Sequence, residues 1–546
     1  MQSTIIMLKP ILFAVVTLLV TYLYRKLRYK RFQQYGRLPQ MPSSLLFGHL
    51  KTLNSLIKRG EADRHPDVMF AEMHESLGRP SLMFVDLRPV NRAMVLISSH
   101  EIAEQVSKPS KLYPTSLPKT DLSYMIHLTG PTSILLSHGE PWRALRKRYN
   151  PAFAPQHLMT LLPCILEKTS SFIRNLDTLA RTGEEFSLVS LAINLTFDII
   201  GAVVMDVDLE AQPLDASRQG ELVRLYVELF QEYWDDKADM PWWLMPNVEM
   251  KRRRLGKRVD TILKDIIYRK HAEQQEKGTG GNQSRSILSL SLQDTKTLSA
   301  ELVDETCDQI KTFLLAGHDT TSITLSWVCY WLSRTPHALE AVRNELDNLL
   351  GTKTDPEYVY AQLLSPEGPD LVHRMTYISA VIKETLRLHP PAATARYSKP
   401  GMGFTVHTPE GEDHCLDGML IYNCEGLIQR DPAIYGDTAE YFVPERWLCD
   451  VDIPASAWRP FERGPRNCIG QEFAMIEIRV IVASIARRFD FTKIGLGELA
   501  LDRNNQPMLY DHGIYKIKSL LYSTRQVNAK PVDGMRMKVR LVSKSK

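Results

Sequence analysis

The sequence predicts a mainly α-helical protein with small β-sheets. Across most of residues 60 to 390, apolar residues recur at steps of three and four, which is the spacing of one helix face. Short strand-like runs at residues 82–85, 93–97 and 535–542 predict the sheets. The chain contains no internal repeat.

The composition is that of a protein with a large apolar core. Of 546 residues, 44% are hydrophobic, and 67 Lys and Arg against 63 Asp and Glu give a net charge of +4. This mild balance does not indicate a nucleic-acid partner. The seven cysteines are an odd number without framework spacing, which favours free thiols in a reducing compartment. His414, Cys415 and Cys424 lack the C-x-x-C partner expected of a zinc site.

The N-terminus predicts a membrane anchor over residues 1–31. Residues 4–24 are apolar except near Lys9 and Pro10, and a run of this length can span a bilayer as a helix. A cleaved signal peptide is the alternative, but its charge would precede the apolar run. Here a basic cluster follows the apolar run, and such a cluster is typical of the cytosolic side of a membrane span. It consists of Arg25, Lys26, Arg28, Lys30 and Arg31. We therefore expect a single-pass anchor with the rest of the chain in the cytosol.

Three other stretches predict local structure. Pro39 and Pro42 favour a stiff, extended connector within residues 32–50. The low-complexity residues 278–286 predict a surface loop. The basic run 251–254 predicts a solvated helix face, because its charges continue along a helical segment.

The longest predicted helix runs from about Ser299 to Arg334. Ser299 is a good N-cap, and Glu301 lies in the first turn, where the helix dipole favours an acid. Pro336 ends the helix, and a single apolar stripe predicts that the helix crosses the core. Its middle, residues 316–321, reads Ala-Gly-His-Asp-Thr-Thr. Gly in a helix costs roughly 1 kcal/mol relative to Ala, and such a local violation tends to mark a functional site.

The most specific pattern spans Phe461 to Gly470 and reads F-x-x-G-x-R-x-C-x-G. Cys468 lies between two glycines and precedes a helical run over about residues 471–487. Glycines let the backbone approach a flat, bulky ligand. A helix N-terminus lowers the pKa of a thiol and favours the thiolate, which is the form that ligates metals.

This pattern closely resembles the haem-binding signature of the cytochromes P-450, in which a Cys thiolate is the proximal ligand of the haem iron. The resemblance implies that Cys468 is the axial ligand and that Phe461 and Arg466 also contact the cofactor.

The same resemblance covers residues 316–321, which match the oxygen-activation motif A-G-x-D-T-T of the family. It assigns Asp319 and Thr320 to proton delivery during dioxygen activation. His318 occupies the variable position, and we expect it to be packed in the helix rather than to bind a ligand.

Two more motifs match the family. Glu384 and Arg387 form E-x-x-R on one helix face, and Phe-Val-Pro-Glu-Arg-Trp at residues 442–447 supplies Arg446. By resemblance these three residues form a buried ion network with a structural role. One departure is Gln429, because many relatives have a histidine at this point before Arg-Asp-Pro.

The last motif, W-x-x-x-R, places Trp142 and Arg146 one helical turn apart. Haem carries two propionates, and arginine suits bidentate recognition of carboxylates. The family pattern implies that Trp142, Arg146, Arg396 and Arg466 contact the propionates.

The resemblance extends over nearly the whole chain and implies one large haem domain of the P-450 fold over residues 51–546. The chain is similar to microsomal members of the family and to fungal enzymes of secondary metabolism. Such a protein inserts one atom of dioxygen into a lipophilic small molecule. Its electrons come from a membrane-bound NADPH-dependent flavoprotein reductase, and its location is the endoplasmic reticulum membrane.

Two alternatives share the haem: an isomerase or dehydratase of the same fold, and a non-catalytic haem-binding protein. The pair Asp319 and Thr320 argues against both, because neither needs to deliver protons to dioxygen. We expect the pocket walls to include residues 112–136, 230–243 and 391–396, which leave the substrate undefined. Residues 241–246, with Trp242 and Trp243, predict a second membrane contact, while core packing of both tryptophans is the alternative.

Overall fold

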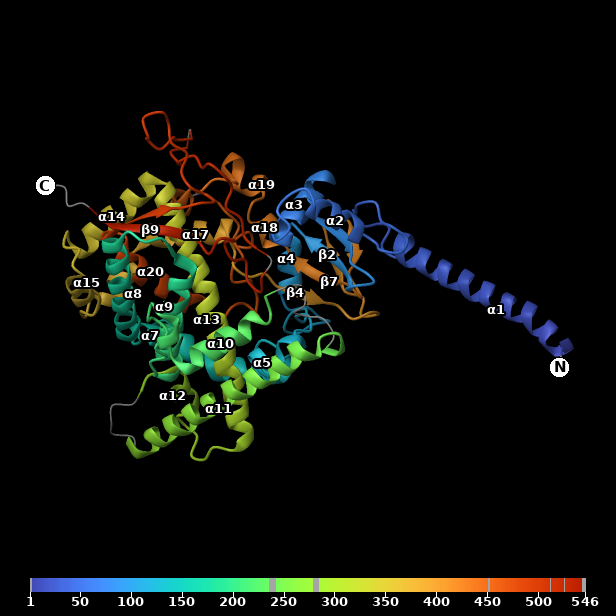
Figure 1. Cartoon of the computed structure of the whole chain (residues 1–546), viewed down its shortest axis with the longest axis horizontal. Helices are drawn as coiled ribbons and strands as arrows, with labels where there is room; N and C mark the ends of the chain where they lie inside the picture. The colour runs from blue at the N-terminus through green and yellow to red at the C-terminus, as the bar shows by residue number, and fades with distance from the viewer. Residues whose placement is uncertain are drawn as a thin grey trace. The chain divides into compact units, whose positions relative to one another are not determined.

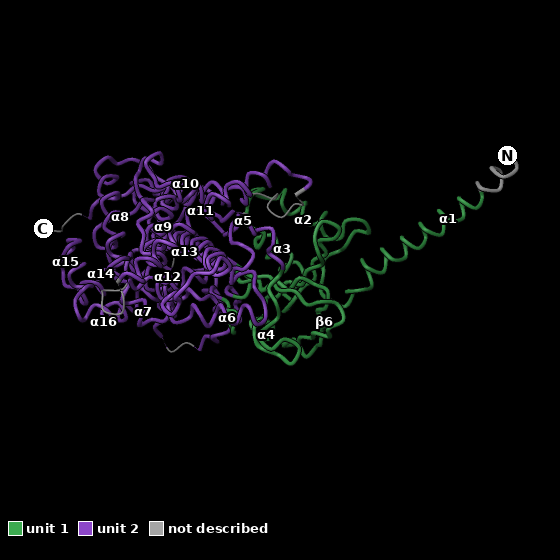
Figure 2. Tube along the Cα trace, turned by 90° about the horizontal axis from the view of Figure 1, so that it is seen from below, with its two compact units in different colours: residues 1–120, 393–428, 462–466 green, residues 121–392, 429–461, 467–546 purple. Residues whose placement is uncertain are grey.

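The computed structural model describes residues 2–234, 242–277, 284–449, 452–510, 512–524 and 526–542. The chain divides into two compact units (Figure 2). Unit 1 comprises Met1–Thr120, Ala393–Ile428 and Glu462–Arg466, and unit 2 comprises Asp121–Ala392, Gln429–Phe461 and Asn467–Lys546.

Unit 1 is built on a four-stranded sheet in the order β1-β2-β7-β4, in which β2 and β7 are parallel and the other pairs antiparallel. A second sheet pairs β5 with β6. The strands are β1 Leu82–Asp86, β2 Ala93–Ile97, β4 Ala395–Tyr397, β5 Thr405–His407, β6 Asp413–Cys415 and β7 Leu420–Asn423. The helices are α1 Gln2–Arg28, α2 Leu50–Ile57, α3 Pro66–Ser76, α4 His100–Ser107 and α18 Glu425–Ile428.

The first two strands are buried on both faces. Alternate residues of β1 and β2 belong to two different apolar clusters, with Phe84 and Val95 in one and Met83 and Leu96 in the other. A strand buried on both faces is apolar throughout, which explains the continuous runs at 82–85 and 93–97. Both predicted strands are confirmed.

Helix α1 continues into the short π-helix η1, Tyr29–Gln33, at the N-terminal end of unit 1 (Figure 1). Residues Pro10–Gln33 have the length and mean hydropathy, 1.5, of a membrane span, and none of the most apolar 18-residue window within them is buried. An exposed apolar helix of this length is stable in a bilayer rather than in water. A second apolar helix, α9 Leu188–Met205, is 78% buried and is a core helix.

Unit 2 is mainly helical and carries one three-stranded antiparallel sheet in the order β3-β9-β8. Its strands are β3 Phe186–Ser187, β8 Phe489–Lys493 and β9 Arg536–Leu541, so the predicted strand at 535–542 is confirmed. Its helices besides α9 are α5 Ile126–Thr129, α6 Gly139–Tyr149, α7 Pro155–Met159, α8 Leu162–Thr182, α10 Glu221–Gln231, α11 Pro246–Lys277, α12 Ile287–Leu292, α13 Ala300–Arg334, α14 Pro336–Leu350, α15 Pro356–Leu363, α16 Gly368–His373, α17 Thr376–Leu388, α19 Pro432–Tyr435 and α20 Gln471–Ile485.

The central helix of unit 2 is α13, which packs against α9, α11, α17 and α20. It begins as predicted, because the Ser299 hydroxyl accepts a hydrogen bond from the Leu302 N–H at 3.2 Å. The single apolar stripe understates its burial, since polar residues on other faces are buried as well. Lys311 is an example, and its ammonium pairs with Asp260 at 2.7 Å and with Asp308 at 3.3 Å.

The basic run at residues 251–254 lies in α11. Arg253 and Arg254 are exposed, as a solvated helix face requires. Arg252 is an exception, because it is buried with its guanidinium 4.1 Å from the centre of the Tyr233 ring. Of the predicted loop 278–286, residues 278–283 lie outside the described residues.

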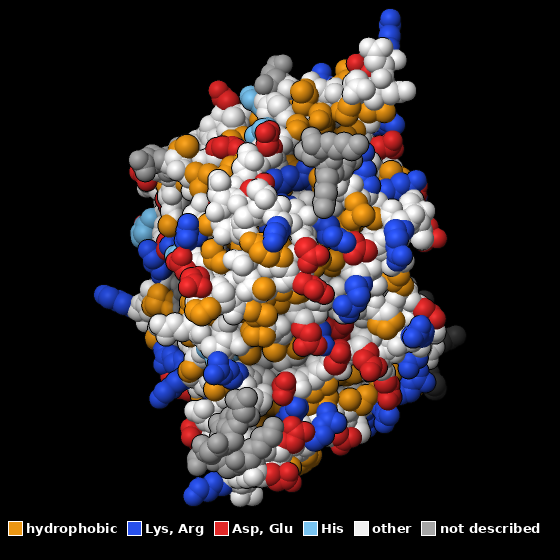
Figure 3. Space-filling view, turned by 90° about the vertical axis from the view of Figure 1, so that its left-hand side faces the viewer, with side chains coloured by type: hydrophobic (Ala, Val, Ile, Leu, Met, Phe, Trp, Pro, Cys, Tyr) orange, Lys and Arg blue, Asp and Glu red, His pale blue; other side chains and the backbone are white. Residues whose placement is uncertain are grey.

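The surface drawn in Figure 3 is the side of the molecule on which α14 and α15 lie in Figure 1. Lys and Arg side chains alternate there with Asp and Glu and with scattered apolar groups. A mixed pattern of this kind is typical of a solvated surface.

Candidate functional site

The middle of α13 borders open space. Residues on either side of it are mostly buried, but Ala316 is exposed, and Gly317 and Thr320 are half-buried. The Thr320 hydroxyl donates to the Ala316 carbonyl oxygen at 2.8 Å. A small residue is required at 317, because a Cβ there would lie 2.6 Å from Ile200 Cδ1. Small side chains and close packing on α9 therefore leave room beside the helix.

His318 is a packed helix residue, as predicted. Its ring stacks on Phe197 with 4.0 Å between ring centres, and its Nδ1 lies 2.6 Å from the Leu314 carbonyl oxygen. Burial lowers the pKa of His318 to about 4, so the ring is neutral at pH 7. The Thr196 hydroxyl of α9 donates to the His318 carbonyl oxygen at 2.7 Å. This bond from outside the helix ties α9 to the middle of α13.

Asp319 is completely buried. Its Oδ1 lies 2.5 Å from the Lys530 ammonium nitrogen, and its Oδ2 accepts a hydrogen bond from the Asn528 amide at 2.5 Å. Asn528 and Lys530 could not be predicted from the sequence, because nothing in the local pattern of the C-terminal segment marks them.

The cysteine loop leads into α20. The Cys468 N–H donates to the Phe461 carbonyl oxygen at 2.9 Å, which closes the loop, and the thiol is exposed. A Cβ built on Gly470 would meet only the Cys468 sulfur, at 3.9 Å, so the space beside the thiol is open. Helix α20 starts three residues after the cysteine, as predicted.

Gly464 of the same motif meets a strict backbone requirement within unit 1. Its φ is +75°, and a Cβ would lie 2.1 Å from the Ser107 carbonyl oxygen. Both facts demand glycine at this position.

Arg146 ties helix α6 to the cysteine loop. Its guanidinium donates to the carbonyl oxygen of Asn467 at 2.8 Å and to the side-chain oxygen of the same residue at 2.9 Å. Burial lowers the pKa of Arg146, and the charge of the Cys468 thiolate opposes that shift. A cation so placed stabilises the thiolate. Trp142, one turn earlier in α6, is buried.

The other two predicted cofactor-binding arginines belong to unit 1. Arg396 of β4 is completely buried and donates to the Ser116 hydroxyl at 3.0 Å and to the Leu117 carbonyl oxygen at 2.8 Å. Arg466 is also buried. Their contacts with propionates stay predictions.

A further acid, Glu477 of α20, was missed in the sequence. It is buried, and its carboxyl lies near the Thr321 side chain of α13. Burial raises its pKa well above the ordinary value. The available signal was a single acid within the apolar run of α20. Helix α13 packs against α20, the helix that follows the cysteine.

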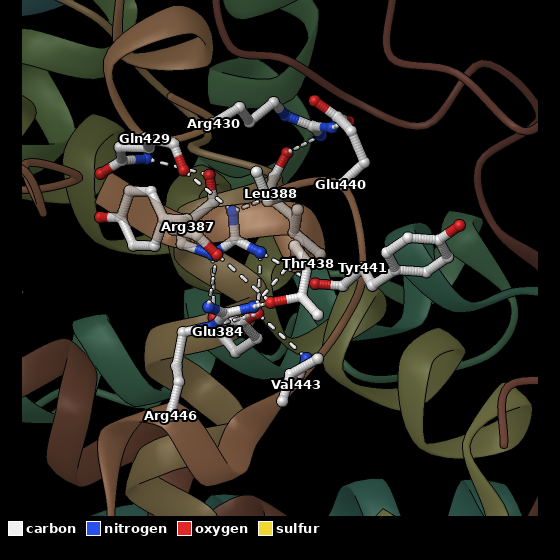
Figure 4. A network of polar contacts seen from close by, with 12 residues as sticks. Glu384, Arg387, Leu388, Gln429, Arg430, Thr438, Glu440, Tyr441, Val443 and Arg446 are labelled. Carbon is white, nitrogen blue, oxygen red and sulfur yellow. Dashed lines mark hydrogen bonds and ion pairs between the residues drawn. The ribbon is translucent and has the colours of Figure 1, made fainter. Parts of the chain in front are cut away.

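The E-x-x-R network is confirmed by geometry (Figure 4). Glu384 and Arg387 are completely buried, and two parallel hydrogen bonds of 2.8 and 2.9 Å join their side chains. Arg446 donates to the same carboxylate at 3.0 Å. The Arg387 guanidinium also donates to the carbonyl oxygens of Gln429, Ala439 and Tyr441. The carboxylate is thus the shared counter-charge of two arginines.

Gln429, the departure from the family pattern, is part of this structure. Its amide donates to the carbonyl oxygens of Leu386 and Arg387 at 3.1 Å each, and its side-chain oxygen accepts from the Arg459 N–H at 2.7 Å. A glutamine can donate and accept at once. It therefore joins the end of α17 to the segment before the cysteine loop.

A cavity of about 420 Å³ lies near the C-terminal ends of α13 and α20. Its lining includes Cys329, Val482 and Phe489, and it contains none of the predicted site residues. Small-molecule sites of this size occur in many proteins, but this one is separate from the motifs described above.

Comparison with known proteins decides the family. The family model described as cytochrome P-450 matches residues 39–509. The chain is a cytochrome P-450.

Its relatives include two fungal cytochrome P-450 monooxygenases. AcrF of Aspergillus aculeatus is 31% identical over 461 residues, which are 79% of this chain and 88% of that protein. PolC of Polytolypa hystricis is 27% identical over 86% of this chain and 84% of that protein. The bifunctional cytochrome P-450/NADPH–P-450 reductase ascE of Acremonium egyptiacum is 35% identical over 209 residues, 36% of this chain and 18% of that protein.

The prediction of a P-450 fold, of a haem-thiolate monooxygenase and of similarity to fungal members is therefore confirmed. Haem is the cofactor of the family, and the residues present fit it. An exposed thiol beside Arg146 and the open space at Gly470 suit a flat, anionic cofactor with a thiolate ligand.

The network makes a stability prediction. In Glu384→Gln, Arg387 and Arg446 lose their buried counter-charge, and we expect the free energy of unfolding to fall by about 3–5 kcal/mol. Urea unfolding followed by circular dichroism measures it. The control is Asp370→Asn, since the pair of Asp370 with Arg374 is exposed and 3.6 Å long, and we expect no measurable loss. Equal stability of Glu384→Gln and wild type would contradict the structural role of the network.

Proposed function

We propose that this monooxygenase holds haem iron through Cys468 and oxidises a lipophilic small molecule at a membrane surface. The observation that carries the proposal is the cysteine loop, which presents an exposed thiol next to Arg146, directly before α20. The haem, when bound, supplies the activation of dioxygen.

The proposed haem contacts are those of the family pattern. We assign Trp142, Arg146, Arg396 and Arg466 to the haem propionates, since a guanidinium suits a carboxylate. Phe461 lies next to the haem in this assignment. Arg146 then has two tasks, because its bonds to Asn467 also orient the loop that carries Cys468.

The proton role falls to Asp319 and Thr320. The buried carboxylate of Asp319 takes up protons, and the Thr320 hydroxyl, beside the open space of α13, orders the donor next to the substrate. An isomerase or dehydratase would not need this pair, and the family comparisons favour the monooxygenase over that alternative.

Electrons come from an NADPH-dependent reductase in this proposal. Fusion of a P-450 to such a reductase in the relative ascE supports that partner. We propose that the reductase is membrane-bound and that the enzyme lies in the endoplasmic reticulum membrane, anchored by α1 with its catalytic part in the cytosol. The substrate class, fungal secondary metabolites, rests on the similarity to fungal members.

A second membrane contact is part of the proposal. Pro241 lies outside the described residues, but Trp243 and Leu244 in η5, Trp242–Leu244, are 63% and 54% exposed. Met250, one turn into α11, is also exposed. Core packing of both tryptophans, the alternative, is contradicted for Trp243. Exposed Trp favours the headgroup region of a bilayer.

The ligand prediction concerns Cys468→Ala. We expect loss of catalysis and of the red-shifted Soret band of the reduced carbon monoxide complex, because a thiolate ligand of the haem iron would cause the shift. The matched control is Cys415→Ala, which removes another exposed thiol and should keep the band. A retained band in Cys468→Ala would refute the ligand assignment.

The proton prediction concerns Thr320→Ala. We expect normal haem content but less product per NADPH, by roughly tenfold or more, with the lost reducing equivalents recovered as hydrogen peroxide. Asp319→Asn should mainly slow turnover. Product, NADPH and peroxide are measured together. Unchanged coupling in Thr320→Ala would favour the isomerase or dehydratase alternative.

The membrane prediction concerns a protein without residues 1–30. We expect it to keep partial affinity for liposomes, and to lose most of that affinity on Trp242→Ser with Trp243→Ser. Flotation with phosphatidylcholine vesicles measures the bound fraction. A fully soluble truncation, or no effect of the two substitutions, would leave α1 as the sole anchor.

A further inference from the structure

The C-terminal segment of unit 2 reaches into the core at the middle of α13. Residues 522–524 and 526–532 pair with one another, with hydrogen bonds from the Thr524 N–H to the Lys530 carbonyl oxygen, 2.7 Å, and from the Val532 N–H to the Tyr522 carbonyl oxygen, 3.1 Å. The Ala529 N–H donates to the Pro391 carbonyl oxygen at 2.8 Å, which fixes this turn beside the end of α17. Thr524, Asn528 and Lys530 are buried. A buried turn of this kind is uncommon, since loops normally lie at the surface.

This turn holds both oxygens of the Asp319 carboxylate. Lys530 faces one oxygen and Asn528 faces the other, each at 2.5 Å. Lys530 is 7% exposed and Asp319 is fully buried, so water screens the pair little. His318 does not supply a counter-charge, because burial keeps it neutral at pH 7. Lys530 therefore provides the positive charge that a buried carboxylate needs.

Lys530 also contacts two aromatic rings, one in the last turn of α10 and one shortly after it. Its ammonium lies 5.0 Å from the ring centres of both Phe230 and Trp234. Cation–π contact with two rings limits the positions of the ammonium and thereby those of the carboxylate.

We infer that Lys530, aided by Asn528, is the positioning residue of the proton relay: it pairs with the Asp319 carboxylate and orients it for transfer toward Thr320. This inference rests on the proposed proton role of Asp319. The family model ends at residue 509, so Asn528 and Lys530 lie outside the segment that the family comparison covers.

The test follows the fate of dioxygen in the holoenzyme with NADPH and a purified P-450 reductase. Reduction by one NADPH and one proton gives one hydrogen peroxide, whereas reduction by two NADPH and two protons gives two waters and requires proton delivery at the O–O bond. We expect Lys530→Met to lower the water-forming fraction by roughly tenfold or more, with normal haem content. Lys530→Arg should restore much of it, because a guanidinium also pairs with a carboxylate.

Infrared spectroscopy of the purified protein gives a readout that is independent of turnover. Lys530→Met should show one more C=O stretch of a neutral carboxylic acid than the wild type and the double variant Asp319→Asn/Lys530→Met, in a difference spectrum. The double variant has no uncompensated charge, so it tests the inference even where Lys530→Met folds poorly. Its water-forming fraction should equal that of Asp319→Asn alone, since Lys530 acts through Asp319.

The matched control is Lys493→Met. The Lys493 side chain is also buried, and its ammonium nitrogen lies 2.5 Å from an Asp533 carboxylate oxygen. Neither residue belongs to the proposed relay. We expect this substitution to lower stability without changing the water-forming fraction.

Three results would overturn the inference. The first is a wild-type water-forming fraction in Lys530→Met while that of Asp319→Asn is lowered. The second is absence of the infrared band, and the third is a double variant whose water-forming fraction differs from that of Asp319→Asn. Wild-type behaviour of Asp319→Asn would overturn the proton role of Asp319 and this inference together, while leaving the outcome for Cys468→Ala unaffected.

Discussion

The burial of α13 is the constraint on which the rest of unit 2 depends. A helix surrounded by other elements normally carries apolar side chains on every face, because an unpaired polar group in the interior costs free energy. Helix α13 instead carries charged and hydroxyl groups along its buried length. Two of the charged groups are paired from other elements, Lys311 by Asp260 of α11 and Asp319 by the C-terminal turn. Elements far apart in sequence are thereby held to one helix.

The same physics explains the Glu384 network. Two guanidiniums and one carboxylate are removed from water, and carbonyl oxygens from the segment 429–441 satisfy the remaining donors. The network therefore ties the segment 429–441 to α17. Gln429 performs part of this task, because its side chain bonds to Leu386, Arg387 and Arg459.

The site combines rigid support with local openness. The cysteine loop is closed by one backbone hydrogen bond and held by Arg146, whereas the thiol itself and the Ala316 face of α13 stay accessible. Rigid placement of reacting groups beside an open volume is what catalysis on a bound cofactor requires. Helices α13 and α20, which carry these features, pack against each other.

The sequence by itself determined the helical class, three strands, the start of α13, the exposed apolar helix α1 and the motifs around Cys468, Asp319 and Glu384. These features depend on local periodicity, capping and short spacing, which are visible in a single chain segment. Only the tertiary structure decided that Arg252 is buried, that Arg146 bonds to Asn467, and that Asn528 and Lys530 meet Asp319. Asp319 and Lys530 are separated by about two hundred residues, and no local pattern specifies which lysine becomes buried. The partner of a buried charge is chosen by the packing of the whole core, because only there does desolvation make an unpaired charge costly.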